Sequence, residues 1–277
     1  METLECSWNT ADGLTLWARG WKPARPKATV CLVHGHGEHV GRYEHVAAAL
    51  AQRDYALMGF DLRGHGRSGG ARGHTPSYEA LLEDIDEFCR QVAARQPGLP
   101  RFLYGHSMGG NLVINYALRR RPNLRGVIAT GPWLELAFQP PPLKVALGKL
   151  MNRLAPSFTQ ASGLETKALA HDAAVVQAYE NDPLVHGQIS ARLFIAMYEA
   201  GQWALQHAAE FPLPLLLMHG DADRLTSAEA SRRFAAAAPQ GICTLRLWPG
   251  FYHEIHNEPE KEQVLQVLLD WLDTHLA

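Results

Sequence analysis

The sequence predicts an α/β fold: a mostly parallel central sheet flanked by helices, with a helical cap inserted between two strands. Three observations support this prediction. Hydrophobic side chains make up 47% of the 277 residues, enough to bury a sizeable core. Short β-branched segments alternate with amphipathic segments of helical period, a pattern typical of a parallel sheet covered on both faces. The alternation stops near residue 132 and resumes after about residue 210.

The first half of the chain is expected to alternate strands with helices. Asp12-Gly13 is typical of a hairpin turn between two strands. Ser77 has the position of an N-cap, and apolar residues from Leu81 to Val92 follow it at helical spacing. Arg119 to Arg121 lie at the expected end of a helix, where the helix dipole favours cations. The expected strands are 5–10, 14–21, 28–33, 55–60, 101–104 and 124–129, and the expected helices are 42–52, one from about 77, and 108–120.

The second half contains the interruption and then two strand–helix pairs. Prolines open a stretch without a convincing strand, in which the apolar residues of 143–154 mark an amphipathic helix. An insertion of roughly 70–80 residues is too long for a plain connection, so a separate cap is expected. The boundaries predicted are 1–131 and 211–277 for the core and 132–210 for the cap. The remaining elements are expected at 213–218 (strand), 226–238 (helix), 242–248 (strand) and 258–276 (helix, with Asn257 as its cap and Pro259 in its first turn).

Charge, hydropathy and cysteine spacing exclude several classes of protein. The net charge of −2 leaves no basic excess for nucleic acid, so no nucleic-acid partner is expected. No apolar run is long enough to span a membrane, and the first five residues, METLE, are acidic where a signal peptide would be basic. Cys6, Cys31, Cys89 and Cys243 have neither metal nor disulfide spacing. These features favour a cytoplasmic protein with free thiols.

The segment Gly105-His-Ser-Met-Gly109 carries the clearest chemical signal. A G-x-S-x-G sequence between an expected strand and an expected helix is typical of a nucleophile elbow. The two glycines permit a sharp turn that lifts the Ser107 hydroxyl above the sheet, at a helix N-terminus where negative charge is favoured. The alternative is a glycine-rich turn with an incidental serine, but the strand–turn–helix context favours a nucleophile.

A nucleophilic serine needs a base and a group that orients the base. With this elbow the acid follows a late strand and the histidine follows the last strand. Asp221 and Asp223 both fit the acid, and His253 and His256 both fit the base, so the pattern alone leaves both choices open. The residues that are not used are expected to cap a turn or to bind the backbone.

Acyl transfer also needs N–H donors for an oxyanion. One is expected at the backbone of Met108, and the other at His36 in the loop His34-Gly-His-Gly-Glu-His39. The same loop is similar to the metal-binding motif of the metallo-β-lactamase fold and could bind zinc. A zinc site would leave the serine motif, the chain order and the cap unexplained. We therefore expect neither a metal nor an organic cofactor.

Five motifs, in order along nearly the whole chain, resemble those of the monoglyceride lipase group of the α/β-hydrolase superfamily. The resemblance implies the α/β-hydrolase fold, and it assigns the acid to Asp223 and the base to His253, beside Ser107. It also implies oxyanion donors at the N–H groups of His36 and Met108. The motifs are His34-Gly-x-Gly-Glu-His39 with Gly41-Arg-Tyr43, Asp61 to Gly70 with Arg72-Gly-His74, Gly105 to Gly110, Tyr179 with Asp182-Pro-Leu184, and His219 to Arg224.

The resemblance further implies an activity and a setting. It implies a serine hydrolase that cleaves monoacylglycerol to glycerol and fatty acid through an acyl-enzyme on Ser107. The alternatives are a lysophospholipase, a general carboxylesterase, an acyltransferase with the same triad, and a binding module that has kept the fold without catalysis. In the family the cap shapes an acyl tunnel and meets the membrane, so peripheral membrane contact through the cap is expected. The residues implied near the polar end of the pocket are Glu38, Arg42, Tyr179 and His256.

Some residues depart from the pattern or admit a second interpretation. The imidazole of His36 replaces a residue that is often smaller in relatives, and it is expected to narrow the mouth of the site. The segment 61–70 is expected to be a rigid loop whose Arg63 and Arg67 pair with carboxylates. Tyr179 fits a core position of the cap equally well, and the apolar stripe of 143–154 fits either a core face or a membrane face. Surface positions are expected for His171, His186, His207 and His275.

Overall fold

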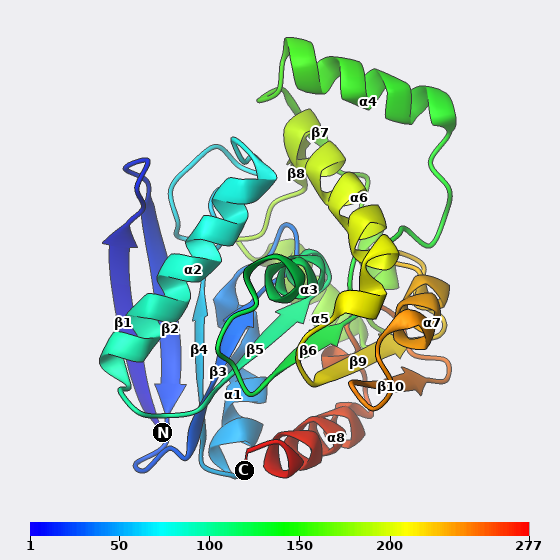
Figure 1. Cartoon of the computed structure of the whole chain (residues 1–277). Helices are drawn as coiled ribbons and strands as arrows, with labels where there is room; N and C mark the ends of the chain where they lie inside the picture. Colours follow the sequence, from blue (N-terminus) through cyan, green and yellow to red (C-terminus); the bar gives the residue numbers. More distant parts are fainter. Residues whose placement is uncertain (277) are drawn as a thin grey trace.

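The computed structural model describes residues 1–276 (Figure 1). Within these residues eight strands form one sheet in the order β1-β2-β4-β3-β5-β6-β9-β10. The strands are β1 Glu2–Asn9, β2 Thr15–Lys22, β3 Ala28–Val33, β4 Tyr55–Phe60, β5 Arg101–His106, β6 Gly126–Thr130, β9 Leu215–Gly220 and β10 Cys243–Trp248. β2 pairs antiparallel with β1 and β4, and the other neighbouring strands pair in parallel. This arrangement confirms the predicted mostly parallel sheet.

Helices cover both faces of the sheet. They are α1 Glu44–Ala51, α2 Tyr78–Arg95, α3 Met108–Arg120, α4 Pro142–Leu154, α5 Ala173–Asn181, α6 Ala191–Gln206, α7 Ala228–Ala237 and α8 Lys261–Thr274. Side chains of α1 and α8 form one hydrophobic cluster with one face of the sheet, whereas α2, α3, α6 and α7 form a second cluster on the other face. Every residue of β3, β4 and β9 is buried, as expected for strands covered on both sides.

The segment 132–210 leaves the sheet after β6 and returns before β9. It contains α4, α5 and α6, and two short strands, β7 (Thr159–Ala161) and β8 (Gln188–Ser190), which pair antiparallel. The prediction that this segment lacks strands is wrong, because three residues are too few to show the alternation by which a strand is recognised. α4 packs on α6 and lies across its end, far from the central sheet (Figure 1).

The last helix begins later than predicted. α8 starts at Lys261 and has no side-chain N-cap. Asn257 instead ends the 3-10 turn Ile255–Asn257, and Pro259 precedes the helix. The side-chain amide of Asn257 donates to Glu254 Oε2 at 2.7 Å. The cap residue was therefore predicted wrongly because its side chain binds a carboxylate on the other side of the turn.

In the loop between β4 and α2, Arg63 and Arg67 pair with carboxylates, as predicted. The guanidinium of buried Arg63 binds Asp84 at 2.6 and 2.7 Å and Asp12 at 2.9 Å. Arg67 lies 3.7 Å from the carboxylate of Glu5. These contacts tie the loop to α2 and to the strands at the sheet edge.

The cysteines and the lengths of the helices relate to the predictions of free thiols and of no membrane-spanning segment. Cys31 and Cys89 are buried, Cys6 and Cys243 are half-buried, and all four are free. Within residues 1–276, no helix combines the length and the apolar composition that crossing a bilayer requires.

The aromatic packing between α2 and the sheet yields a test of the fold. Phe88 is 1% exposed and packs on Phe60, with ring centroids 4.7 Å apart. Phe88→Ala should lower the free energy of unfolding by about 3–5 kcal/mol, because it removes apolar contacts and leaves a cavity. Phe138→Ala removes the same group from a side chain that is 58% exposed, so its effect should stay within about 0.5 kcal/mol. Urea unfolding followed by circular dichroism measures both, and equal effects would contradict this packing.

Candidate active site

Ser107 occupies a strained turn between β5 and α3. Its backbone has φ 54° and ψ −116°, a conformation that costs a non-glycine residue about 1–3 kcal/mol. The turn is possible because its neighbours lack side chains. A Cβ on Gly105 would lie 2.2 Å from the carbonyl oxygen of Gly109, and a Cβ on Gly109 would lie 2.0 Å from that of Val33. Both glycines of the motif are therefore required by close backbone contacts.

Backbone hydrogen bonds hold the strained serine. The N–H of Ser107 donates to the carbonyl of Thr130 in β6 at 2.9 Å. The carbonyl of Ser107 accepts from the N–H of Trp133 at 2.9 Å and from that of Asn111 at 3.1 Å. The turn is thus fixed by the neighbouring strand, by the segment that follows it, and by α3.

Three side chains from distant segments meet at this turn. Ser107 Oγ lies 2.9 Å from His253 Nε2, and His253 Nδ1 lies 2.7 Å from Asp223 Oδ2. A carboxylate can only accept, so Nδ1 carries the proton and the Nε2 of the neutral imidazole accepts from the serine hydroxyl. Asp223 follows β9 and His253 follows β10. The parallel strands deliver all three residues to the same edge of the sheet.

Asp223 is held in one orientation by several donors. Its Oδ1 accepts from the backbone N–H groups of Leu225 and Thr226, at 2.7 and 3.0 Å. Its Oδ2 accepts from the hydroxyl of Thr226 at 2.8 Å and from His219 Nε2 at 3.0 Å, in addition to His253. Burial raises the pKa of Asp223, but His253 and His219 outweigh burial and hold that pKa well below its usual value. The carboxyl therefore remains ionised.

The competing acid and base lie elsewhere. Asp221 is exposed, and its Oδ1 accepts from the backbone N–H of Gly250 at 2.6 Å. His256 is buried and stacks on Tyr43 with centroids 5.1 Å apart. Burial lowers the pKa of His256 to about 3. Neither residue contacts the partner that a triad would require.

The electrostatics distinguish His253 from the other histidines around it. Burial lowers the pKa of His253, but the Asp223 carboxylate more than offsets burial, so this pKa lies above its usual value of 6.5. The ring of His106 lies 4.8 Å from that of His253, and burial holds the pKa of His106 well below 6.5. Proton uptake beside Ser107 is therefore concentrated on a single imidazole.

The loop of residues 34–39 passes directly beside the serine. A Cβ on Gly35 would lie 3.2 Å from the Cβ of Ser107. The backbone N–H of His36 makes no hydrogen bond with any residue of 1–276. The N–H of Met108 belongs to the first turn of α3, where helix geometry leaves such groups without an intrahelical partner. Both expected donors thus have a free N–H near the serine.

The His36 side chain packs among other histidines. Its ring centroid lies 5.5 Å from that of His65 and 5.7 Å from that of His186. Burial lowers the pKa of His36 to about 3, so the ring is neutral. His186 is half-buried, and its ring nitrogen Nε2 lies 3.0 Å from the carbonyl of Gly64. Of the four histidines predicted at the surface, His171 is exposed, whereas His186, His207 and His275 are half-buried. His186 is partly covered because the insertion folds back onto this loop.

The four residues expected at the polar end of the pocket separate into two pairs. Glu38 and Tyr179 line a cavity beside Ser107, whereas Arg42 and His256 do not. The free volume of this cavity is about 10 Å³, room for about one water molecule. The cavity is therefore narrow, Leu164, Leu169 and Tyr179 of the insertion contribute to its lining, and Ser107 remains partly exposed.

Sequence reasoning did not single out Glu254, which contacts the site most directly among the residues it missed. Its carboxylate binds the guanidinium of Arg42 through two hydrogen bonds of 2.7 Å. Its position directly after His253 was the available signal. Spacing could not reveal the contact, because 212 positions separate the two partners.

The loop 34–39 does not gather metal ligands. Within residues 1–276, no group of three or more His, Cys, Asp and Glu side chains is arranged to hold a metal ion. His34 Nδ1 binds the carbonyl of Gly35 at 2.7 Å, and His34 Nε2 accepts from the N–H of Leu62 at 2.9 Å. Both ring nitrogens of His34 thus bind backbone groups, one in its own loop and one in the loop after β4.

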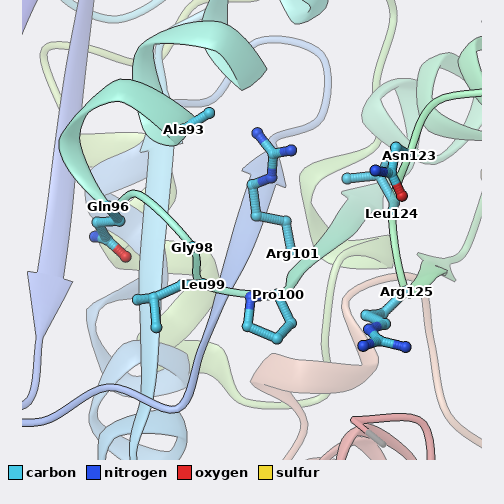
Figure 2. Close-up of a pocket in the computed structure, with 9 residues that line it drawn as sticks. All are labelled: Ala93, Gln96, Gly98, Leu99, Pro100, Arg101, Asn123, Leu124 and Arg125. Atoms are coloured by element: carbon cyan, nitrogen blue, oxygen red, sulfur yellow. The ribbon is translucent and has the colours of Figure 1, made fainter.

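A larger cavity, of about 490 Å³, lies at the opposite edge of the sheet (Figure 2). It is lined by residues before and at the start of β5, among them Gln96 and Arg101, and by Leu124 and Arg125 ahead of β6. Ser107 follows the other end of β5. Cavity volume alone would therefore not identify the site of Ser107.

Comparisons with known proteins agree with this geometry. A family model described as "Serine aminopeptidase, S33" matches residues 24–260. An uncharacterised abhydrolase domain-containing protein of Dictyostelium discoideum is 38% identical over 266 residues, which is 95% of this chain but 28% of that protein. The monoacylglycerol lipase of Mycolicibacterium smegmatis is 37% identical over 258 residues, 92% of each chain. The crystal structure of Paleococcus ferrophilus monoacylglycerol lipase has a TM-score of 0.85 and 34% identity, covering 99% of this chain and 100% of that one.

The proton on His253 should control the reactivity of Ser107. Only the neutral imidazole can accept the serine proton, so the rate of covalent labelling by a fluorophosphonate should fall as pH drops through the pKa of His253. Because that pKa is raised, the half-maximal rate should occur above pH 6.5. Labelling rates measured by mass spectrometry from pH 5 to 9 give the midpoint. A flat profile, or a midpoint below pH 6.5, would contradict the electrostatics of the site.

Proposed function

The chain belongs to the hydrolase family described as "Serine aminopeptidase, S33", and on that premise we propose that it is a serine hydrolase that cleaves the ester of a monoacylglycerol. The observation that carries the proposal is the continuous contact from Ser107 through His253 to Asp223, at 2.9 and 2.7 Å. The family description names a peptidase. The two relatives named monoacylglycerol lipase favour an ester as the substrate.

In the proposed reaction, Ser107 Oγ attacks the ester carbonyl while His253 Nε2 takes its proton. Asp223 keeps Nδ1 protonated and stabilises the imidazolium that forms. The N–H groups of His36 and Met108 would hold the negative oxygen of the tetrahedral intermediate. His253 then gives its proton to the oxygen of the departing glycerol, and the acyl chain remains bound to Ser107. Water, deprotonated by His253, releases the fatty acid and restores the serine.

The alcohol part of the substrate would occupy the polar end of the small cavity. Glu38 and Tyr179 line it, so these two of the expected residues are placed to contact glycerol. Arg42 and His256 lie outside the lining, so they would affect substrate binding only through other residues. Of the four residues, only Glu38 and Tyr179 are therefore proposed to contact the substrate directly.

An acyl chain requires more room than the narrow cavity beside Ser107 offers. Leu164 and Leu169, from the segment between β7 and α5, line the cavity beside Ser107. We propose that 132–210 acts as a cap on the core formed by 1–131 and 211–277, and that this segment moves to admit the chain. Gly163, with φ 71° and no atom within 4 Å of its Cβ position, offers the backbone freedom for such a movement.

We also propose that α4 contacts a membrane. Its half-buried residues are Val145, Gly148, Met151 and Asn152; a Cβ on Gly148 would lie 3.2 Å from Ile195, and Asn152 accepts from Arg192. The opposite face carries four leucines that are 50–80% exposed, at positions 143, 147, 150 and 154. This helix therefore points its apolar stripe outward.

The surroundings of the stripe suit an anionic lipid surface. Phe138 and Phe158, at either end of α4, are 58% and 55% exposed. Residues 136–164 contain three basic side chains and no acidic one. Basic residues beside an apolar stripe attract anionic headgroups. Together with the free cysteines, these features support a cytoplasmic protein that meets membranes peripherally.

A panel of esters tests the proposed activity. Monooleoylglycerol should be hydrolysed with a higher kcat/KM than lysophosphatidylcholine, because the cavity beside Ser107 is small and glycerol needs less room than a glycerophosphocholine group. Release of fatty acid, measured by mass spectrometry, gives both rates, and formation of labelled monooleoylglycerol from added deuterated glycerol reveals acyl transfer. Faster cleavage of the lysophospholipid, or acyl transfer to glycerol in preference to water, would replace this proposal with one of its alternatives.

Variants of the triad are the controls for that panel. Ser107→Ala should abolish turnover while leaving the circular dichroism spectrum unchanged. Asp223→Asn should reduce kcat by about 10⁴-fold, since it favours the wrong tautomer of His253. Asp221→Asn is the matched change two residues away, on a side chain that binds only a backbone N–H, and it should retain kcat within about twofold.

Membrane contact is tested separately from catalysis. Leu147→Glu places a charge in the apolar stripe and should weaken binding to phosphatidylglycerol vesicles about tenfold or more. Hydrolysis of a water-soluble butyrate ester should stay unchanged. Ala178→Glu adds the same charge at an exposed position of α5 and should leave vesicle binding unaffected. Vesicle sedimentation measures both, and equal binding of the two variants would show that α4 does not dock on lipid.

A further inference from the structure

We propose that Arg42 is a positioning residue whose guanidinium holds the loop of the oxyanion donor His36 in register with the loop of the base His253. The inference rests on the proposed serine hydrolase activity, because register between these loops matters only if both act on one substrate. It differs from a substrate-binding role for Arg42. The arginine lies outside the lining of the cavity beside Ser107.

On one side the arginine binds the oxyanion loop. Arg42 Nη1 donates to Glu38 Oε2 at 2.7 Å. The other oxygen of Glu38 accepts from the backbone N–H of Gly35 at 2.6 Å and from the hydroxyl of Tyr43 at 2.8 Å. Glu38 therefore fixes the backbone one residue before His36. Any displacement of the Glu38 carboxylate would move the peptide that leads into the proposed donor.

On the other side the arginine binds the loop of the base. Nη1 and Nη2 of Arg42 donate to the two oxygens of Glu254, each at 2.7 Å. Glu254 directly follows His253, and its backbone N–H donates to the carbonyl of Leu169 at 2.7 Å. Asn257 donates to the same carboxylate at 2.7 Å. The planar two-point contact leaves Glu254 little freedom to rotate or slide.

The contact is buried and therefore strong enough to position backbone. The side chains of Arg42, Glu38 and Glu254 are 10%, 3% and 2% exposed. The ring of Tyr179 covers the guanidinium at 4.8 Å. With little water to compete, each of the three charged groups depends on the others for its hydrogen bonds. One side chain thus joins segments that are 212 positions apart in the chain.

Loss of register should appear in kcat. The transition state needs the serine, the imidazole and the oxyanion donors at once, and a misplacement of about 1 Å can cost about 100-fold. A bound substrate would make no direct contact with Arg42, because its side chain lies outside the cavity lining. A positioning role therefore predicts a lower kcat with little change in KM, whereas a binding role predicts a higher KM.

The bridge also carries charge that His253 senses. Burial lowers the pKa of His253, while the carboxylates of Asp223, Glu254 and Glu38 raise it. Replacing the Glu254 carboxylate by an amide removes one of the groups that stabilise the imidazolium. The pKa of His253 should then fall, and the acid limb of the kcat/KM profile should shift to lower pH. The other ionisable groups that face His253 are the neutral imidazoles of His106 and His256 and, behind Glu254, the guanidinium of Arg42.

The test compares Arg42→Met and Arg42→Lys with Arg63→Met, using the full chain and a water-soluble butyrate ester. Arg63 is a matched control, since it is 4% exposed and also binds two carboxylates, but it ties the loop to α2 and to the sheet edge. Arg42→Met should lower kcat about 10- to 100-fold with KM within about threefold. Arg42→Lys should retain an intermediate kcat, and Arg63→Met should lower the Tm while keeping kcat within about twofold.

Two more variants keep the test decisive. If Arg42→Met does not fold, Arg42→Met/Glu254→Gln removes one of the two buried carboxylates left without a cation, the one beside His253, and gives the same comparison. Glu254→Gln alone should shift the acid limb of kcat/KM to lower pH, which a purely structural role would not do. An unchanged kcat in the Arg42 variants, a rise in KM alone, an equal loss of kcat in Arg63→Met, or an unmoved acid limb would each overturn the inference.

Different results would overturn the proposed function. A wild-type chain that neither hydrolyses esters nor is labelled at Ser107 by a fluorophosphonate would overturn both proposals. A wild-type chain that labels but prefers another ester would overturn only the substrate class. The labelling rates of the Arg42 variants relative to wild type would then still test the positioning role.

Discussion

The unfavourable backbone conformation of Ser107 is the constraint on which the rest of the site depends. A left-handed serine at the end of β5 is retained because Gly105 and Gly109 admit backbone where a Cβ would clash and because Thr130 binds its N–H. The strain raises the hydroxyl to the edge where the loops after β9 and β10 arrive. Without that turn the imidazole of His253 would have no hydroxyl within reach.

Around this turn the protein controls charge by burial and pairing. Most imidazoles near the serine have a pKa lowered by burial, including His34, His36, His106 and His256. His253 alone among these five has a raised pKa, because Asp223 contacts its Nδ1. The carboxylates of Glu38 and Glu254 are matched by Arg42. A crowded histidine environment is thereby reduced to one proton acceptor beside the nucleophile.

The inserted segment 132–210 determines the surroundings of Ser107. Its residues line the narrow cavity beside Ser107, whose free volume is about 10 Å³. Its helix α4 lies far from the central sheet (Figure 1) and carries four exposed leucines. If α4 docks on lipid as proposed, an ester with an apolar chain would enter the site from the lipid surface without its chain being fully hydrated on the way. The narrow cavity and the exposed stripe both involve the inserted segment, and the proposed substrate has one apolar tail.

By itself the sequence determined the local structure: the strand runs such as 28–33, the N-cap at Ser77 and the elbow at Ser107, since period, capping and turn chemistry are written in adjacent residues. Spacing alone left Asp221 beside Asp223 and His253 beside His256, and the resemblance to a family was needed to choose. The sequence did not reveal β7 and β8, it wrongly indicated Asn257 as a cap, and it gave no sign that Arg42 contacts Glu254. The tertiary structure decided those outcomes. A contact between distant residues depends on where the sheet places each loop, and the pattern of neighbouring residues does not specify that position.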